Sequence, residues 1–254
     1  MSLDPAADAP PAQRARGGFL YGTYALTAVT IVAAICLLLL ALTPGLRRRR
    51  RIARESARIA FAIAGIPLTS SGTELIGQRP CVVIANHASY LDGMILTAAL
   101  PPVFSFVIKR EVTNVPFLHL LLRRIGSQFV ERFDRHRGGV DARRILRAAE
   151  AGEALAFFPE GTFRRDAGLG RFHSGAFAAA ARAGLPVVPV VIRGSRELLP
   201  AGAWLPRRGR LEVIVRPAID TAGAASEAIV RVRDTSRRAI LDLLEEPDLE
   251  RSPG

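Results

Sequence analysis

The stretch CVVIANHASYLD, residues 81–92, joins a short apolar run to a polar turn that holds one histidine and one aspartate. The run 81–85 has no polar alternation, which is typical of a strand buried on both faces. The residues after Asp92 follow a helical pattern. We therefore expect a strand, a turn and a helix, with His87 and Asp92 at the carboxyl end of the strand, where open α/β sheets bind ligands.

The same alternation of strand and helix continues along the chain. Apolar runs predict further strands over 103–108, 128–130, 154–158, 187–192 and 211–215, and helical spacing predicts helices over 93–100, 116–124, 139–151, 175–183 and 224–244. This order indicates an α/β fold, a mostly parallel central sheet flanked by helices, in one domain over residues 67–244. Turn residues crowd 67–80, where we expect a short hairpin, and 245–254 resembles a frayed polar tail.

An apolar segment precedes this domain. Residues 1–16 are small and polar and are expected to form a disordered arm, whereas residues 17–46 contain no charged residue. As a helix the uncharged segment would be about 45 Å long, against about 30 Å of hydrocarbon core, so it predicts a transmembrane helix. A cleaved signal peptide fits less well, because the apolar part is too long and its arginines follow it. The segment could also enter one leaflet and return.

Five consecutive arginines, Arg47–Arg51, follow the apolar segment. This positive flank predicts that the domain lies on the cytoplasmic side of the cell membrane. Residues 52–66 alternate basic and apolar positions at helical spacing, as in a helix that lies among lipid headgroups. We therefore expect 17–66 to form a transmembrane helix and an interfacial helix. The arginines suit two roles that do not exclude each other, a stop to translocation and the binding of anionic lipid at about 1 kcal/mol per residue.

The composition limits the class of partner. The formal net charge is +12, and Lys109 is the only lysine. A basic chain favours an anionic partner, and the absence of a nucleic-acid module points to a phospholipid membrane or a phosphorylated substrate rather than nucleic acid. A hydrophobic content of 49% excludes disorder of the whole chain. Cys36 and Cys81 lack pairing or metal-ligand spacing, and we expect both to be small buried residues.

The pair His87 and Asp92 suits general-base chemistry. A histidine takes a proton from an alcohol at neutral pH, and a carboxylate on its other ring nitrogen fixes the tautomer. Residues five apart on a regular helix diverge by about 140°, so the two side chains meet only if the chain turns between them. Taken alone, the spacing is better explained by a helix-capping Asp92 beside an unrelated His87.

Three further blocks follow in order: GSQFVER at 126–132, FPEGT at 158–162 and LPVVPVV at 185–191. Together with the N-H-x4-D block at 86–92, they resemble the 1-acylglycerol-3-phosphate acyltransferase family of glycerolipid acyltransferases, over roughly residues 80–220. The resemblance implies a glycerol-3-phosphate acyltransferase-like fold. It also implies transfer of a fatty acyl group from acyl-CoA or acyl carrier protein to a lysophospholipid hydroxyl, with 1-acylglycerol-3-phosphate as acceptor and phosphatidic acid as product.

The resemblance further assigns roles to residues. It implies His87 as general base and Asp92 as its orienting partner, with no covalent acyl-enzyme and no cofactor beyond the acyl donor. It implies that substrate is bound by Asn86, Lys109, Gly126, Phe129, Arg132, Glu160, Gly161, Thr162 and Arg164. Taken without the resemblance, Lys109 is equally an ordinary solvated lysine and Glu160 a solvated turn residue.

One position departs from the family. Members often carry arginine directly after the Gly-Thr of the third block, where it contacts the acceptor phosphate, but here Phe163 is followed by Arg164 and Arg165. Either arginine could reach the same phosphate, or the acceptor differs from lysophosphatidic acid. The departure concerns the identity of the acceptor, not the type of reaction.

The remaining candidates are weaker. His119 is expected to be a core or interfacial residue, His136 to be solvated, and His173 to lie near the site. No His, Cys, Asp and Glu cluster has metal-ligand spacing, so we expect no metal. Trp204, with arginines following it, suits either a membrane surface or packing on its own domain.

Two other functions compete with acyl transfer. One is a non-catalytic lipid-binding protein of the same fold, which the intact pair of His87 and Asp92 argues against. The other is a lipid hydrolase in which His87 activates water, although the chain lacks a Gly-x-Ser-x-Gly elbow.

Overall fold

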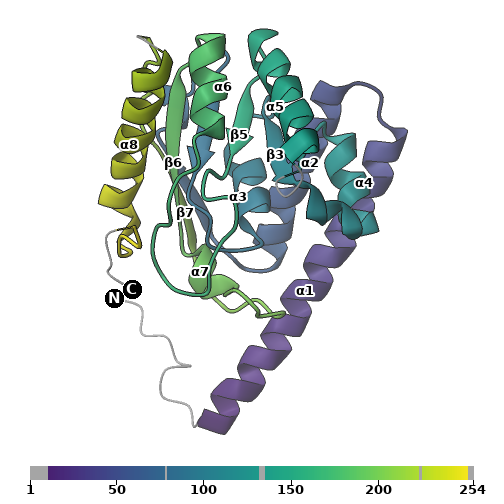
Figure 1. Ribbon diagram of the computed structural model, residues 1–254. Coiled ribbons are helices and arrows are strands. Elements are labelled where there is room, and N and C mark those ends of the chain that lie inside the picture. The colour runs from purple at the N-terminus through teal and green to yellow at the C-terminus, as the bar shows by residue number, and fades with distance from the viewer. Residues whose placement is uncertain (1–10, 78, 132–134, 223–224, 251–254) are drawn as a thin grey trace.

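The computed structural model describes residues 11–77, 79–131, 135–222 and 225–250. A single sheet runs through the molecule in the order β1-β7-β6-β2-β5-β3-β4 (Figure 1). Neighbouring strands of this described sheet are parallel, apart from the antiparallel pair β6 and β7. The strands are β1 Leu68–Ser71, β2 Val82–Ala85, β3 Ser105–Lys109, β4 Gln128–Val130, β5 Leu155–Phe157, β6 Val187–Arg193 and β7 Leu211–Val215. The predicted mostly parallel α/β sheet is therefore confirmed.

Helices cover both faces of the sheet, which explains why its central strands are apolar throughout. Val83 and Ala85 of β2 face one core with α2 and α3, whereas Val82 and Ile84 face a second core with α5, α6 and α8. Figure 1 shows α5, α6 and α8 on the near face. The helices are α1 Pro11–Leu42, α2 Leu46–Ile63, α3 Asp92–Ala99, α4 Pro116–Arg124, α5 Arg135–Glu150, α6 Gly175–Ala183, α7 Ser195–Leu198 and α8 Ala225–Leu244, with 3₁₀ turns at Thr73–Leu75 and Arg110–Asn114.

The helices α1 and α2 form an antiparallel pair beside the sheet. Within α1, Gly18–Leu42 is long and apolar enough to cross a membrane, and about a fifth of its most apolar window is buried in the structure. The Tyr21 hydroxyl donates a hydrogen bond to the Ala64 carbonyl at 3.0 Å, and the Tyr24 hydroxyl donates to the Ile63 carbonyl at 2.9 Å. These bonds satisfy carbonyls at the C-terminal end of α2 that have no partner within the helix.

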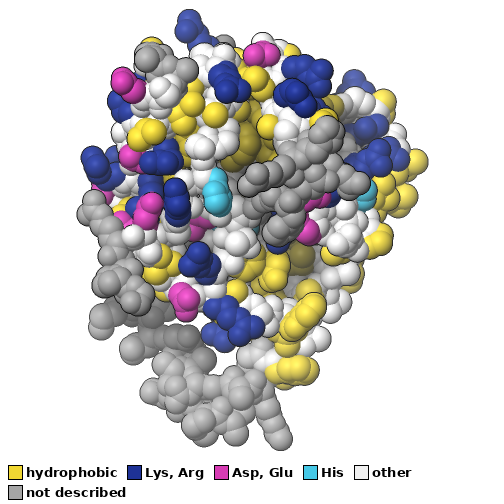
Figure 2. Space-filling view, viewed as in Figure 1, with side chains coloured by type: hydrophobic (Ala, Val, Ile, Leu, Met, Phe, Trp, Pro, Cys, Tyr) yellow, Lys and Arg dark blue, Asp and Glu magenta, His cyan; other side chains and the backbone are white. Residues whose placement is uncertain are grey.

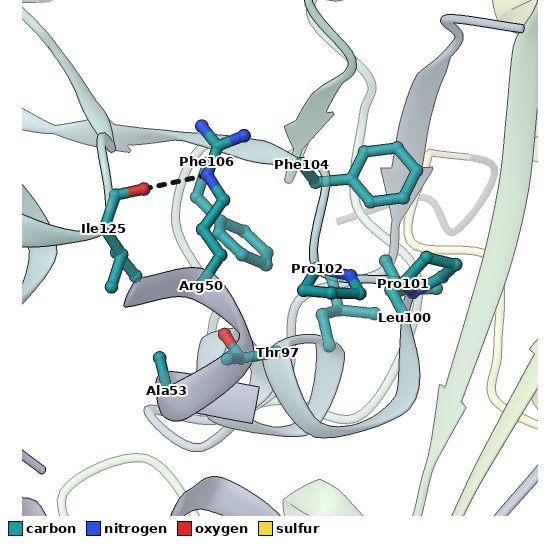
Figure 3. Close-up of a pocket in the computed structure, with 10 residues that line it drawn as sticks. Arg50, Ala53, Thr97, Leu100, Pro101, Pro102, Phe104, Phe106 and Ile125 are labelled. Carbon is teal, nitrogen blue, oxygen red and sulfur yellow. Dashed lines mark hydrogen bonds between the residues drawn. The ribbon is translucent and has the colours of Figure 1, made fainter. Parts of the chain in front are cut away.

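Arg50 joins α2 to the rest of the domain (Figure 3). Its Nε donates to the Ile125 carbonyl at 3.0 Å, just beyond the end of α4, and its Nη1 donates to the Val103 carbonyl at 2.5 Å. It also lines a cavity of about 20 Å³ with Thr97 and Phe106, which is room for about one water molecule. Arg50 therefore holds α2 against the domain, whereas Arg48, in the same run of arginines, is exposed.

Three expectations about the chain ends and the turn-rich segment need correction. No hairpin forms within the described part of 67–80, because β1 pairs in parallel with β7, far along the chain. The helix α1 begins at Pro11, so part of the predicted 1–16 arm is helical, while residues 1–10 lie outside the described residues. Residues 245–250 of the predicted 245–254 tail are not frayed, since Glu246 pairs with Arg196 and Asp248 with Arg237.

Candidate active site

The loop between β2 and α3 brings His87 and Asp92 together. The Nδ1 atom of His87 lies 2.8 Å from the Oδ2 atom of Asp92. The same oxygen accepts the backbone N–H groups of Ala88 at 2.7 Å and Ser89 at 2.8 Å. The chain turns at residues 89–91 before α3 begins at Asp92. Because of this turn, two side chains that a continuous helix would separate are in contact.

Two polar side chains of the same loop anchor it to neighbouring segments. The buried Asn86 amide donates to the Ile192 carbonyl at 2.9 Å and accepts the Ile192 N–H at 2.8 Å. The buried Ser89 hydroxyl donates to the Leu199 carbonyl at 2.9 Å. Asn86 thereby continues the pairing of β2 with β6 beyond the strand end. Its polar atoms face β6, so Asn86 positions the loop.

Glu160 lies in the turn after β5, the strand beside β2, and binds the His87 loop. Its Oε1 accepts the backbone N–H of His87 at 2.7 Å, and its Oε2 accepts the backbone N–H of Gly170 at 2.8 Å. Burial raises the pKa of Glu160, and the two N–H bonds partly oppose that rise. A Cβ on Gly170 would lie 2.9 Å from Oε2, so glycine lets the backbone approach the carboxylate. Both carboxylate oxygens therefore bind backbone.

Aromatic rings surround the His87 imidazole. Phe158 stacks on it with ring centroids 4.3 Å apart, and Phe163 meets it edge-on at 4.8 Å. Phe163 also meets Tyr90 edge-on at 4.7 Å. The His87 side chain is only 18% exposed. The rings limit its rotation and keep bulk water from most of the imidazole.

His87 opens onto a cavity of about 400 Å³ that is lined mainly by apolar side chains. The volume lies in the usual range for a small-molecule site. Its walls come from the loop between β2 and α3, from β3, α3 and α4, and from the N-terminal helices. The helix α1 contributes Val29, Val32, Ala33 and Cys36, and α2 contributes Ala53, Ser56, Ala57 and Ala60. The cavity therefore runs from the polar site to the apolar helix pair.

Of the other predicted substrate-binding residues, some line this cavity and others lie outside it. Lys109 and Gly161 line the cavity with His87. Thr162 and Arg164 are exposed just beyond it, and the Arg164 carbonyl accepts a bond from Arg196.

The second block is only partly described. Gly126 has a φ of 76° and follows the end of α4, where a Cβ would lie 2.9 Å from the Leu46 side chain. Phe129 packs edge-on against His119 at 5.2 Å. Arg132, predicted to hold a phosphate, lies outside the described residues. The glycine therefore permits a close contact with α2, and the assigned roles in substrate binding stay predictions.

Several site features were not predicted. Phe158 and Tyr90 lie inside the motif blocks, but nothing in their spacing indicated contact with the imidazole. The contribution of α1 to the cavity wall could have been inferred only from the three-dimensional arrangement. Among the described residues, no three His, Cys, Asp or Glu side chains form a group that could hold a metal ion.

Comparisons with known proteins agree with this geometry. The family model described as acyltransferase matches residues 67–193. A 1-acyl-sn-glycerol-3-phosphate acyltransferase of Pseudomonas aeruginosa is 27% identical over 78% of this chain and 79% of its own length. The chloroplastic enzyme BAT2 of Brassica napus is 31% identical over 68% of this chain and 52% of its own, so the chain spans about half of that relative.

Two further matches are a relative with a different acceptor in its name and a solved structure. A lyso-ornithine lipid O-acyltransferase of Rhizobium meliloti is 36% identical over 46% of this chain and 39% of its own length. The crystal structure of the 1-acyl-sn-glycerophosphate acyltransferase PlsC from Thermotoga maritima superposes with a TM-score of 0.75, covering 91% of this chain and 97% of that one at 22% identity. That likeness shows a shared fold. With half of its length matched by the family model, the chain belongs to the acyltransferase family.

Proposed function

We propose that this chain is a membrane-bound acyltransferase that moves a fatty acyl group from acyl-CoA or acyl carrier protein onto the free hydroxyl of 1-acylglycerol-3-phosphate. The observation that carries the proposal is a histidine, oriented by a buried carboxylate, at the mouth of an apolar cavity. The polar end suits the reacting hydroxyl, and the apolar walls suit a fatty acyl chain. The names of the relatives from Pseudomonas and Brassica support the same reaction.

The mechanism follows from the ring nitrogens of His87. Nδ1 donates to Asp92, so Nε2 keeps its lone pair and can accept the proton of the acceptor hydroxyl. The hydroxyl oxygen then attacks the thioester carbonyl to form a tetrahedral intermediate. This intermediate collapses to the ester and releases the thiolate, which takes the proton from the imidazolium. No cofactor beyond the acyl donor enters this sequence.

The Asp92 carboxylate stabilises the imidazolium that exists between these proton transfers. General-base help contributes about 10²–10⁴-fold, so positioning of the two substrates must supply much of the remaining rate enhancement. The cavity would provide this positioning by holding the acyl chain beside His87.

The exposed apolar side chains favour membrane attachment through the helices around the cavity. They are Leu26, Ile31, Ile35, Leu38, Leu39 and Leu42 of α1, Ile59 and Ile63 of α2, and Phe117, Leu118 and Leu120 of α4. A face of this kind suits burial in lipid. The arginine run Arg47–Arg51 supports a cytoplasmic location for the domain.

The contacts of α1 favour insertion into one leaflet rather than a full crossing. Tyr21 lies under the Arg208 guanidinium, and Leu40 packs in a cluster with Ile125. Leu40 lies nineteen positions after Tyr21 in the helix, a distance of about 28 Å, which is close to the thickness of the hydrocarbon core. Both contacts are with the same α/β domain, so a crossing helix would have to break one of them.

Labelling of an engineered cysteine tests this placement. Gly18→Cys in α1 should react with an impermeant maleimide from the side that carries the domain. Reaction only from the opposite side would establish a crossing helix. Cys36 and Cys81 are buried and provide a low background.

The side chain of Phe163 favours a second candidate for the lipid that accepts the acyl group. An apolar ring against His87 and Tyr90 occupies the position where an arginine was expected to bind the acceptor phosphate. The name of the Rhizobium relative offers a lyso-lipid with an amino-acid head group. Lysophosphatidic acid remains the leading acceptor, with Lys109 and Arg164 as the cations for its phosphate.

The experiment incubates the purified chain in lipid nanodiscs with labelled acyl-CoA or acyl carrier protein. The acceptors are 1-acylglycerol-3-phosphate and lyso-ornithine lipid, and the labelled product is identified by mass. His87→Ala should abolish product, whereas His173→Ala, at an exposed histidine, should not. Undiminished transfer by the His87→Ala variant would refute the mechanism, and release of free fatty acid alone would indicate a hydrolase.

A further inference from the structure

The loop between α7 and β7 presents an exposed tryptophan. Trp204 is the only tryptophan of the chain, and its side chain is 87% exposed, more than any other large hydrophobic side chain in the described residues. Tryptophan is usually buried to a large degree. An indole that is so exposed on the folded chain is suited to contact a partner outside it.

The loop is held in place against α1. The Leu205 side chain packs so closely on Gly22 that a Cβ there would lie 2.8 Å from the Leu205 Cβ. The Arg208 guanidinium lies 4.5 Å over the Tyr21 ring, within the range of a cation–π contact. The backbone N–H of Arg207 donates to the Leu198 carbonyl at 2.7 Å. Trp204 therefore has a fixed position beside the N-terminal part of α1, as Figure 1 shows for the loop after α7.

The surroundings of Trp204 match the chemistry of a lipid headgroup layer. Phe19, Leu20 and Tyr24 are exposed on the adjoining end of α1. Arg207 and Arg210 are exposed on the loop itself. Figure 2 shows hydrophobic side chains over the α1 side of the molecule with cations beside them. Aromatic residues and arginines together are characteristic of membrane interfaces that contain anionic lipid.

We propose that the Trp204 loop is a second membrane anchor, with the indole at the boundary of headgroups and acyl chains and the arginines on lipid phosphates. It depends on the proposed function only in requiring a membrane. The partner is a bilayer with anionic lipid, because the apolar side chains of the loop continue those of α1 and its cations complement anionic headgroups. Anchors at Trp204 and at the opposite end of α1 would together fix the tilt of the domain.

The single tryptophan makes the test direct, since fluorescence excited above the tyrosine band reports Trp204 alone. The full chain is placed in nanodiscs of zwitterionic lipid with or without phosphatidylglycerol, using brominated or ordinary acyl chains. We expect bromines near the headgroup to quench Trp204 at least about twofold, more than bromines near the chain end, with protection from acrylamide. The matched control is Trp204→Phe combined with Arg238→Trp, at an exposed position of α8.

The arginine contribution is tested by Arg207→Glu with Arg210→Glu, which leaves Arg208 on Tyr21. Lipid quenching of Trp204 should fall in discs with phosphatidylglycerol and change less in purely zwitterionic discs. Equal quenching of this variant and wild type in both lipids would refute the role of the arginines. Full acrylamide quenching of Trp204 without bromine quenching would overturn the anchor. Either result would leave the His87-dependent transfer assay unaffected, so the two proposals fail separately.

Discussion

The Asp92→Asn variant tests the negative charge of Asp92, because asparagine has nearly the same shape but no charge. A single oxygen, Oδ2, accepts the bonds from His87, Ala88 and Ser89, while Oδ1 is buried without a hydrogen-bond partner among the described residues. Asparagine can place its carbonyl oxygen at the Oδ2 position and its amide nitrogen at the Oδ1 position. The loop and the histidine tautomer are then kept and the negative charge is lost, while the amide N–H groups at the Oδ1 position have no acceptor among the described residues.

The size of the effect follows from the lost attraction between carboxylate and imidazolium. Two unit charges about 4 Å apart at an effective dielectric constant of about 20 attract by about 4 kcal/mol. Each 1.36 kcal/mol corresponds to about tenfold in rate, so full loss gives about 10³-fold. Partial exposure of His87, 18% of its side chain, weakens the attraction. We expect kcat to fall about 10²–10³-fold for the Asn variant.

The assay measures initial rates of acyl transfer in nanodiscs, with thermal unfolding as the control for folding. The melting temperature of the Asn variant should move by only a few degrees, since about 1 kcal/mol corresponds to about 2–4 °C for a chain of this size. Asp92→Ala is the contrasting variant, because it leaves two buried N–H groups without an acceptor at about 1–3 kcal/mol each. Activity of the Asn variant within about threefold of wild type would refute the charge argument.

Four further predictions concern Arg50, Glu160 and Cys81. Arg50→Ala should lower the melting temperature by about 3–12 °C through loss of about 1.5–3 kcal/mol of bonding, whereas Arg48→Ala should not. Glu160→Gln should lower kcat at least about tenfold by misplacing the His87 loop. Burial raises the pKa of Glu160, so the folded state binds a proton more tightly than the unfolded state. The stability of the wild-type protein relative to the Glu160→Gln variant should therefore fall as the pH rises above about 4.5, which thermal scans at several pH values would measure. Burial raises the pKa of Cys81 to about 11, whereas free cysteine has a pKa of about 8.5. Alkylation of Cys81 at pH 8, followed by mass spectrometry, should therefore be over about a hundredfold slower than alkylation of free cysteine.

Much of the sheet could be predicted because its strands are short, apolar and bounded by turn residues. The predicted 128–130 and 211–215 match β4 and β7, and 116–124 matches α4. The run 211–215 lies between Arg210 and Arg216, and 116–124 begins at Pro116 and ends at Arg124, whereas 128–130 follows Ser127 and ends before Glu131. The place of β1 in the main sheet was not predicted, because its sequence, Leu68-Thr69-Ser70-Ser71, has the polarity of a turn and suggested a local hairpin. Three of its four residues are exposed at the sheet edge, and only pairing with β7 makes it a strand.

The site was predictable as a set of blocks but not as a set of contacts. The contact between His87 and Asp92 followed from the turn between them, whereas the clamp by Glu160 depends on β5 lying next to β2. Likewise, the apolar character of α1 indicated a membrane without indicating that the helix also forms part of the cavity wall. Such features arise from the packing of segments far apart in sequence, which no local pattern encodes.

The backbone N–H groups of residues 87, 88 and 89 are all bound by carboxylates, which come from two different motif blocks. Glu160 accepts the first and Asp92 accepts the other two, so protein carboxylates already occupy these donors. The loop therefore cannot use these N–H groups to stabilise the oxyanion of the tetrahedral intermediate that forms when the hydroxyl attacks the thioester, and that charge requires other donors. Lys109 is a cation at the same sheet edge and lines the same cavity. If it serves the oxyanion, Lys109→Gln should lower kcat, whereas binding of an acceptor phosphate would instead appear as a higher KM for that acceptor.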